Sequence, residues 1–85
     1  MAEEEIGVID HYFSKIGVAI IELTQGELNT GDTIHIKGAT TDFTQKVDSM
    51  QMEHEEIDQA RKGDSVGLKV ADHVRKHDKV YKVIE

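Results

Sequence analysis

Short runs of β-branched residues, broken by glycine at close intervals, are the feature that most restricts the fold of this chain. In the run Thr33-Ile-His-Ile-Lys37, apolar and polar residues alternate, so Ile34 and Ile36 should share the inner face of a strand. Gly38 ends that run, and the whole chain contains no proline. Repetition of this pattern with short connections predicts an all-β sandwich or barrel without a long helix.

Six strands are expected from this pattern. Residues 6–13 and 16–23 are separated by Ser14 and Lys15 alone, which is the arrangement of a hairpin. Gly7 and Gly17 fall inside these two runs, where a glycine marks sharp coiling or a close backbone approach. The other strands are expected at residues 33–37, 42–54, 65–71 and 79–84. Because closure removes open sheet edges at this size, we predict a small closed six-stranded Greek-key-like β-barrel.

Residues 42–60 depart from simple alternation. The apolar positions before residue 48 keep one parity and those after residue 49 keep the other. A two-residue period changes parity only where an extra residue is inserted, which predicts a β-bulge at Asp48 or Ser49 in one long bent strand. Residues 53–60 favour helix, but they are too few to form a stable one. We therefore expect a loop there with at most one helical turn.

The chain is 85 residues long, which is enough for one domain with a small core. We assign residues 6–85 to that single domain, and residues 1–5 to an acidic flexible N-terminal tail. The absence of cysteine excludes disulfides and thiolate metal sites, which fits a reducing compartment. No apolar run reaches the roughly 20 residues that span a bilayer, so we expect a cytoplasmic protein without a membrane segment.

The net charge of −7 is distributed unevenly. Residues 1–60 carry 13 acidic and three basic groups, a balance of −10, whereas residues 61–85 carry seven basic and four acidic groups, a balance of +3. The simpler interpretation is that charges alternate on solvated faces, and the alternative is one surface that contacts anions. The basic residues of the second segment are Arg61, Lys62, Lys69, Arg75, Lys76, Lys79 and Lys82.

Two Gly-Asp pairs precede predicted strands, at Gly31-Asp32 and Gly63-Asp64. A glycine adopts a positive φ without a steric penalty, and an aspartate side chain accepts hydrogen bonds from nearby backbone N–H groups. Together with Gly26, which opens the polar loop before the first pair, these residues are interpreted as structural turns.

Four segments, taken in order and with their separations, resemble the second domain of the elongation factor Tu family. They are Gly26-Glu-Leu-Asn-Thr-Gly-Asp-Thr-Ile34, Val47-Asp-Ser-Met-Gln-Met52, Ile57-Asp-Gln-Ala60 and Lys62-Gly-Asp-Ser-Val-Gly-Leu68. The resemblance runs from residue 6 to residue 84 and is strongest to stand-alone translation elongation factor-like small proteins. Similar barrels are C-terminal modules of U32-type peptidase proteins. The resemblance implies a β-barrel, in which Ala60 would be a small core contact.

The GTP binding of the full-length family is not carried over to this chain. A G-x-x-x-x-G-K-[ST] loop, whose N–H groups and lysine hold the phosphates, is absent. We therefore expect no GTP site and no other cofactor. No serine, threonine or cysteine stands beside a candidate base in a recognisable setting, so we predict no enzymatic activity.

The histidines were considered as metal ligands. His73 and His77 lie four residues apart, a spacing that suits zinc when both lie on one helical face. The charged residues between them and the lack of a third ligand nearby favour an exposed turn instead. The other three histidines are expected at ordinary surface positions: His11, His35 and His54.

The resemblance implies two functions without catalysis. The second domain of the elongation factor Tu family contacts the acceptor end of aminoacyl-tRNA, so the first hypothesis is a translation-associated module. It would contact RNA through the seven basic residues of the C-terminal third, with weak, strongly salt-dependent binding. The alternative is a protein-interaction barrel that docks on a translation factor, a U32-type peptidase-like enzyme or itself. The acidity of the chain and the lack of aromatic platforms favour this alternative.

Overall fold

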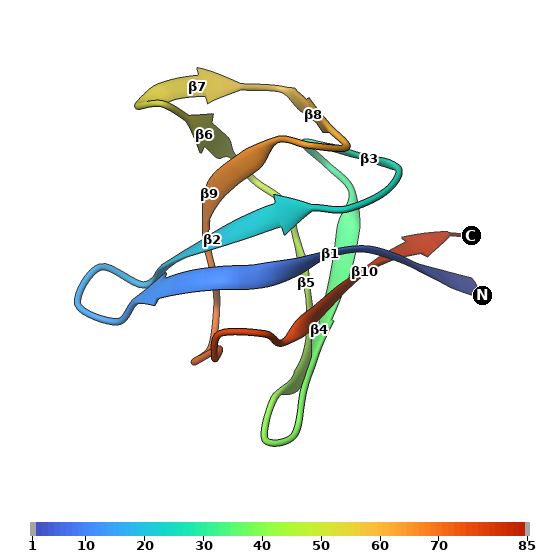
Figure 1. Cartoon of the computed structure of the whole chain (residues 1–85), viewed down its shortest axis with the longest axis vertical. Helices are drawn as coiled ribbons and strands as arrows, with labels where there is room; N and C mark the ends of the chain where they lie inside the picture. Colours follow the sequence, from blue (N-terminus) through green and yellow to red (C-terminus); the bar gives the residue numbers. More distant parts are fainter. Residues whose placement is uncertain (1, 85) are drawn as a thin grey trace.

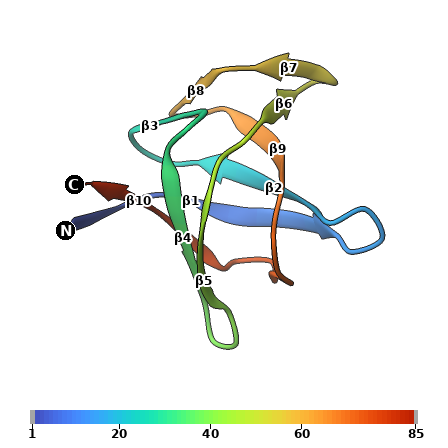
Figure 2. The ribbon, with the colours of Figure 1, turned by 180° about the vertical axis from the view of Figure 1, so that it is seen from behind.

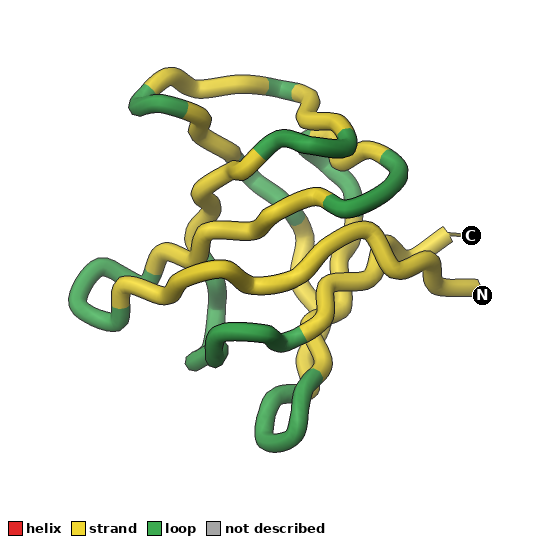
Figure 3. The backbone as a smooth tube through the Cα atoms, viewed as in Figure 1, coloured by secondary structure: helices red, strands yellow, loops and turns green. Residues whose placement is uncertain are grey.

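The computed structural model describes residues 2–84, so the first residue of the expected tail and the last of the expected domain lie outside the described residues. Within this range the chain forms strands and loops without a helix (Figure 3), and the predicted all-β class is confirmed. No helix of residues 2–84 is long and apolar enough to cross a membrane. The strands are β1 (Ala2–Phe13), β2 (Val18–Leu23), β3 (Glu27–Asn29), β4 (Thr33–Lys37), β5 (Asp42–Lys46), β6 (Met50–Met52), β7 (Glu55–Ile57), β8 (Gln59–Arg61), β9 (Ser65–Lys69) and β10 (Lys79–Ile84).

Eight of the strands form one sheet in the order β5-β4-β10-β1-β2-β9-β6-β7, while β3 and β8 form a separate pair. Every pairing is antiparallel. β1 lies in the middle of the large sheet, between β10 and β2. The sheet curls on itself (Figures 1 and 2), so that its inner face encloses the core. The start of β1 and the end of β10 lie side by side.

The closed six-stranded barrel is not confirmed. The structure has ten strands, and no pairing within residues 2–84 joins the two outer strands β5 and β7 of the large sheet. A side chain links β5 to the end of β9 instead. The Nε2 atom of Gln45 donates a hydrogen bond to the carbonyl oxygen of Lys69 at 2.9 Å, and its Oε1 accepts one from the N–H of Ala71 at 2.6 Å. The curl is therefore held across this gap by a side chain rather than by a continuous ladder.

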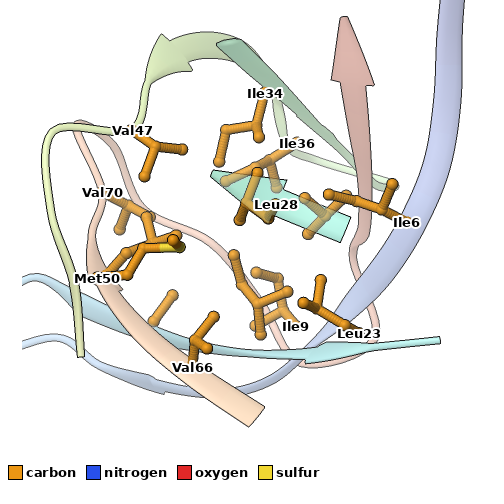
Figure 4. Close-up of a cluster of buried hydrophobic side chains, with 14 of the residues drawn as sticks. Ile6, Ile9, Leu23, Leu28, Ile34, Ile36, Val47, Met50, Val66 and Val70 are labelled. Carbon is orange, nitrogen blue, oxygen red and sulfur yellow. The ribbon is translucent and has the colours of Figure 1, made fainter. Parts of the chain in front are cut away.

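A single cluster of buried aliphatic side chains fills the inside of the curl (Figure 4). Ile34 and Ile36 are fully buried on β4, as the alternation predicts. Val66 and Leu68 of β9 also point inward, at 0% and 3% exposure. The rest of the cluster comes from most of the other elements: Ile6, Ile9, Ala19, Ile21, Leu23, Leu28, Val47, Met50, Ala60, Val70, Val74 and Val80.

The small pair β3 and β8 lies at the upper end of the molecule in Figure 1. Leu28 and Ala60 are opposite each other in this pair, and both are fully buried. The inferred core position of Ala60 is therefore confirmed. Three-residue strands contain too few positions for alternation to be visible, which is why both segments were expected to be loops.

Two local predictions about strand boundaries are wrong. The loop of the first hairpin is Ser14–Gly17 rather than two residues, and Gly17 lies in the turn with φ 67°. The segment 42–54 is not one bent strand, because residues 47–49 separate β5 from β6. There Val47 still bonds to residues 31 and 32, just before β4, whereas residues 48 and 49 have no strand partner. This break, and not a bulge, changes the parity of the apolar positions.

The bulges of this fold lie in β1. The register of β1 shifts between Glu5 and Gly7 against β10, and between Ile9 and His11 against β2. A Cβ atom at Gly7 would overlap the carbonyl oxygen of Glu22, which confirms the close backbone approach expected for this glycine. Strong coiling of the central strand is therefore built into its sequence.

Residues 2–5, assigned above to an acidic tail, form the first part of β1. They pair with residues 81–84 of β10. The boundary expected at residue 6 therefore does not coincide with the start of regular structure. Residues 53–60, expected to be a loop with at most one helical turn, contain β7 and the start of β8.

Candidate functional site

β2 is apolar on its inner face and along the first part of its outer face, where only Glu22 near its end is charged. On the inner face, Ala19, Ile21 and Leu23 are buried in the core. On the outer face, Val18 and Ile20 are only partly buried. Strands that are apolar on both faces are typical of sheets that are covered on both sides. The outer face of β2 is thus the place where the chain leaves apolar surface incompletely covered.

A groove with a volume of about 450 Å³ lies on this outer face. Its floor is formed by β2 and β9, and its walls are the β1–β2 and β6–β7 hairpins. Both hairpins project from the same side of the molecule, on the left in Figure 1 and on the right in Figure 2. We call this feature the hairpin groove. The lining residues that matter below are Phe13, Ile16, Val18, Ile20, His54 and Gly67.

Gly67 of β9 keeps the groove open. It pairs with Ile20 of β2 on one side and with Gln51 of β6 on the other. A Cβ atom at this position would lie 3.3 Å from Cδ1 of Ile20 and 3.6 Å from Cγ1 of Val18. A larger side chain would therefore occupy the hollow itself.

The β1–β2 hairpin supplies the most exposed apolar side chains of the groove. Ile16 is 62% exposed and Phe13 is 44% exposed. The ring of Phe13 is held edge-on by the ring of His11, with centroids 4.5 Å apart. Single exposed apolar residues are common on proteins, but a contiguous set beside a hollow is typical of an interaction site.

The tip of the β6–β7 hairpin has an unusual backbone. Glu53 and His54 form its two-residue turn, between the paired residues Met52 and Glu55, with φ values of 52° and 67°. Two positive φ values define a type I′ turn, which normally contains Asn-Gly. A left-handed residue with a side chain costs about 1–2 kcal/mol. The wall of the groove is therefore built on a strained turn.

The same hairpin is strongly acidic. Residues 50–57 carry three carboxylates and neither lysine nor arginine, and two more carboxylates flank the hairpin at residues 48 and 58. None of the five takes part in the ion pairs recorded for residues 2–84. Of the five, Glu53 lines the groove, and Lys69 of β9 lines it as well. The five residues are Asp48, Glu53, Glu55, Glu56 and Asp58.

The seven basic residues of the C-terminal third are spread along the molecule, and two of them form ion pairs. Lys79 pairs with Glu5 at 3.7 Å, and Lys82 pairs with Asp32 at 3.4 Å. β8 and the loop of residues 70–78 lie at opposite ends of the molecule in Figure 1. Contact of these residues with RNA stays a prediction. The remaining five lie at the end of β8, in the groove lining and in that loop: Arg61, Lys62, Lys69, Arg75 and Lys76.

The Gly-Asp turns share one geometry, and a third turn has it too. The residue before the aspartate has a positive φ in Gly31-Asp32 (92°), Gly63-Asp64 (94°) and His77-Asp78 (77°). In each, the aspartate Oδ2 accepts a hydrogen bond from the N–H three residues earlier, at 2.8, 3.0 and 2.9 Å. The aspartate N–H donates back to the carbonyl of that residue. The third copy is hard to recognise in the sequence because histidine replaces glycine, although Lys62-Gly-Asp64 and Lys76-His-Asp78 are parallel.

The remaining turn glycines also have a structural role. Gly26 has φ 70°, and its carbonyl accepts a hydrogen bond from the N–H of Lys62, which ties the first loop to the second. Asp78 is only 6% exposed, and the missing side chain of Gly38 leaves room for its carboxylate. The two contacts lie in different parts of the fold, the first beside β3 and β8 and the second at the turn between β4 and β5.

The histidine pair considered as a metal site lies in a loop rather than on a helix. The ring of His73 packs edge-on against Tyr12, with centroids 4.9 Å apart, and the N–H of His77 donates to the carbonyl of Ile9. Among residues 2–84 there is no group of three or more His, Asp and Glu residues that could hold a metal ion.

One surface histidine has a more specific environment than the sequence indicated. Nδ1 of His35 lies 2.8 Å from Oε2 of Glu3, and its Nε2 lies 2.5 Å from Oδ1 of Asp42. The hydrogen bond to Asp42, followed by the one to Glu3, raises the pKa of His35 above its ordinary value. The bond to His35 in turn lowers the pKa of Asp42. This clamp joins β1, β4 and β5 away from the groove.

The fold and the groove define a small all-β domain with a partly apolar hollow on the outer face of its sheet. Residues 17–78 match the family described as Elongation factor Tu domain 2. The chain belongs to this family, and the resemblance noted in the sequence is confirmed.

The curated relatives are longer proteins. The chain is 44% identical over 78 residues to an uncharacterized protease, MJ0090, of Methanocaldococcus jannaschii, which covers 91% of this chain and 19% of that protein. It is 42% identical over 72 residues to a collagenase of Porphyromonas gingivalis. These 72 residues make up 84% of this chain and 20% of the collagenase. The chain therefore spans about a fifth of the length of the curated relatives that it matches.

A solved structure has the same fold. The C-terminal domain of a Geobacillus thermoleovorans protein described as a U32 peptidase superimposes with a TM-score of 0.88 at 24% identity. The match covers 95% of this chain and 93% of that domain. The curled sheet described above is thus also the fold of that domain.

Proposed function

We propose that this chain is a non-catalytic module that docks on a U32 peptidase-like enzyme. The observation that carries this proposal is the extent of the match to the two proteases. Nearly all of this chain aligns with them, but it accounts for only 19–20% of their length. A shared segment of that size is a separable domain, and most of each protease lies outside it.

The site supports binding rather than chemistry. Most of the lining surface of the hairpin groove is apolar, as in binding pockets, although five of its eleven lining residues are polar. Ser49 and His54 both line it, but the side-chain hydrogen bonds recorded for residues 2–84 do not join them. A serine nucleophile needs a base within hydrogen-bond reach, so the groove resembles a contact surface more than a catalytic centre.

The RNA-contacting module remains the second hypothesis, together with a cytoplasmic location. It has less support, because two of its seven basic residues are paired with carboxylates and the others lie at separate places. A phosphate backbone binds best to cations that converge on one surface.

A domain exchange in the collagenase tests the docking proposal. Collagen cleavage would be measured for the intact collagenase, for a variant lacking its matching 72 residues, and for a variant carrying this chain in their place. We expect deletion to reduce cleavage more than tenfold and the replacement to restore at least half of it. A folded replacement that is as inactive as the deletion, or a deletion without effect, would contradict the proposal.

A further inference from the structure

We propose that the hairpin groove binds an extended segment of a partner protein that carries bulky apolar side chains alternating with lysine or arginine. The inference rests on the proposed docking function, because it names the surface and the chemistry through which docking occurs. Three observations carry it: the apolar floor, the spacing of the floor residues, and the uncompensated charge of one wall.

The floor defines the apolar part of the ligand. Val18 and Ile20 present β-branched side chains outward, and Gly67 beside them has no side chain to fill the space. Phe13 and Ile16 extend this surface at the hairpin tip, where they remain largely exposed. Burial of such contiguous apolar area is the main driving force for association.

The spacing of the floor indicates an extended ligand. Val18 and Ile20 occupy alternate positions on the outer face of β2, and Ile16 precedes them in the turn of the hairpin. Side chains on one face of a strand repeat at that interval, about 6–7 Å apart. A segment in extended conformation presents its own alternate side chains at the same interval, so its apolar residues can contact successive positions of the floor.

The acidic wall defines the charged part. The β6–β7 hairpin carries Glu53, Glu55 and Glu56 without an ion pair in the described chain, and Glu53 lines the groove. Lys69 of β9 also lines the groove, so the negative charge lies on the hairpin side alone. Lysine and arginine place their aliphatic stems along apolar surface while their charged ends reach outward. In an extended ligand the residues between the apolar ones face away from the floor, and the long side chain of a lysine or arginine can bend from there towards the carboxylates of the wall.

Peptide titration followed by NMR tests this directly. The ¹⁵N-labelled 85-residue chain would be titrated with acetyl-GKLKLKG-amide, with its Glu-for-Lys counterpart, with its Ser-for-Leu counterpart and with a single-stranded RNA oligonucleotide. We expect the basic apolar peptide to shift the amides of Ile16, Val18, Ile20 and Gly67. Its affinity should fall at least fivefold between about 50 mM and about 300 mM salt. The other two peptides should bind at least tenfold more weakly.

A matched pair of variants locates the site. Gly67→Val fills the hollow and should weaken binding of the peptide at least fivefold. Ile84→Ser removes an apolar residue of β10 that is about as exposed as Phe13, 42% against 44%, and should leave binding unchanged. Because Gly67 has an ordinary φ and its nearest contact is a flexible side-chain end, the valine variant should fold. Its dispersed amide spectrum checks this.

Several results would overturn the inference. They are no shift with about 1 mM of the basic peptide, shifts confined to other surfaces, equal binding of the acidic peptide, or groove shifts caused by RNA alone. The collagenase exchange separates this failure from failure of the proposed function. If this chain restores cleavage but Gly67→Val restores it equally, the module docks through another surface. If the chain restores nothing, the docking function itself is wrong.

Discussion

The two faces of β2 have the same kind of sequence but different surroundings. Ile21 on the inner face is fully buried among core residues from other strands, whereas Ile20, its neighbour on the outer face, borders an open groove. Both are isoleucines in one strand, so the difference does not come from composition. The difference arises because other strands of the chain pack over the inner face and leave part of the outer face uncovered.

This contrast separates stability from function. A domain of this size buries only about 60% of its unfolded surface, so one packed face has to supply most of the hydrophobic stabilisation. The second apolar face adds little to stability while it is exposed. Burial of this face by a partner would release the favourable free energy of removing apolar surface from water.

Truncation on the two faces should give the largest difference. We expect Ile21→Ala to lower the free energy of unfolding by about 3 kcal/mol, since it removes buried methyl groups and leaves a cavity. Ile16→Ala on the exposed hairpin tip should change it by less than about 0.5 kcal/mol. Urea unfolding of the two variants measures both values, and equal losses would break the distinction between the faces.

The strained turn at the wall of the groove allows a second test of the outer side of the molecule. Replacement of Glu53-His54 by Asn-Gly should raise the free energy of unfolding by about 1.5 kcal/mol, because Asn-Gly favours the type I′ conformation that the wild-type residues resist. Thermal unfolding of the double variant tests this. A lower melting temperature would show that the turn does not have the positive φ values of this structure.

Substitutions in the three aspartate turns show whether turns outside the groove are strained as well. His77→Gly should stabilise the chain by about 1 kcal/mol, because glycine accepts the φ of 77° without a steric penalty. Gly63→Ala, the matched change in the opposite direction, should destabilise it by about 1–2 kcal/mol. Chemical denaturation of both variants would contradict the shared geometry if the two effects had the same sign.

The smallest effect is expected from the clamp around His35. The pKa of His35 is raised in the folded state, so its contribution to stability is present below the ordinary histidine pKa of about 6.5 and is lost as the pH rises through the folded-state value. The stability difference between wild type and His35→Gln should therefore be larger at about pH 5.5 than at about pH 8.5. An NMR titration of the ring protons should show a pKa above that of the unfolded chain. A difference that grows with pH would reverse the sign and contradict the clamp.

Much of the buried core, and the strands that form it, could be predicted from the sequence. Alternation identified the inward residues of β4 and β9, and the composition identified the all-β class. The short strands β3, β6, β7 and β8 could not be predicted, because three residues do not establish a period and their partners lie far away in the sequence. Tertiary pairing, not local preference, converted residues 55–57 from a helix-favouring segment into a strand.

The groove was harder to predict than the core. The continuous apolar run of residues 16–21 was a usable signal, since it contains no polar outward position. Its meaning depended on Gly67 and on the acidic hairpin, which lie about 30 to 50 residues further along the chain and reach β2 only in the folded structure. The His35 clamp was missed for the same reason, because its partners lie 32 and 7 residues away on other strands.

The docking surface is tested most directly by calorimetry. This chain would be titrated into the Methanocaldococcus jannaschii protease after removal of the 78 matching residues. The account predicts that the wild-type chain and Ile84→Ser bind with equal affinity, and that Ile16→Asp and Gly67→Val bind at least tenfold more weakly. Equal binding by all four chains, or no binding by the wild type, would contradict the assignment of the outer face of β2 as the docking surface.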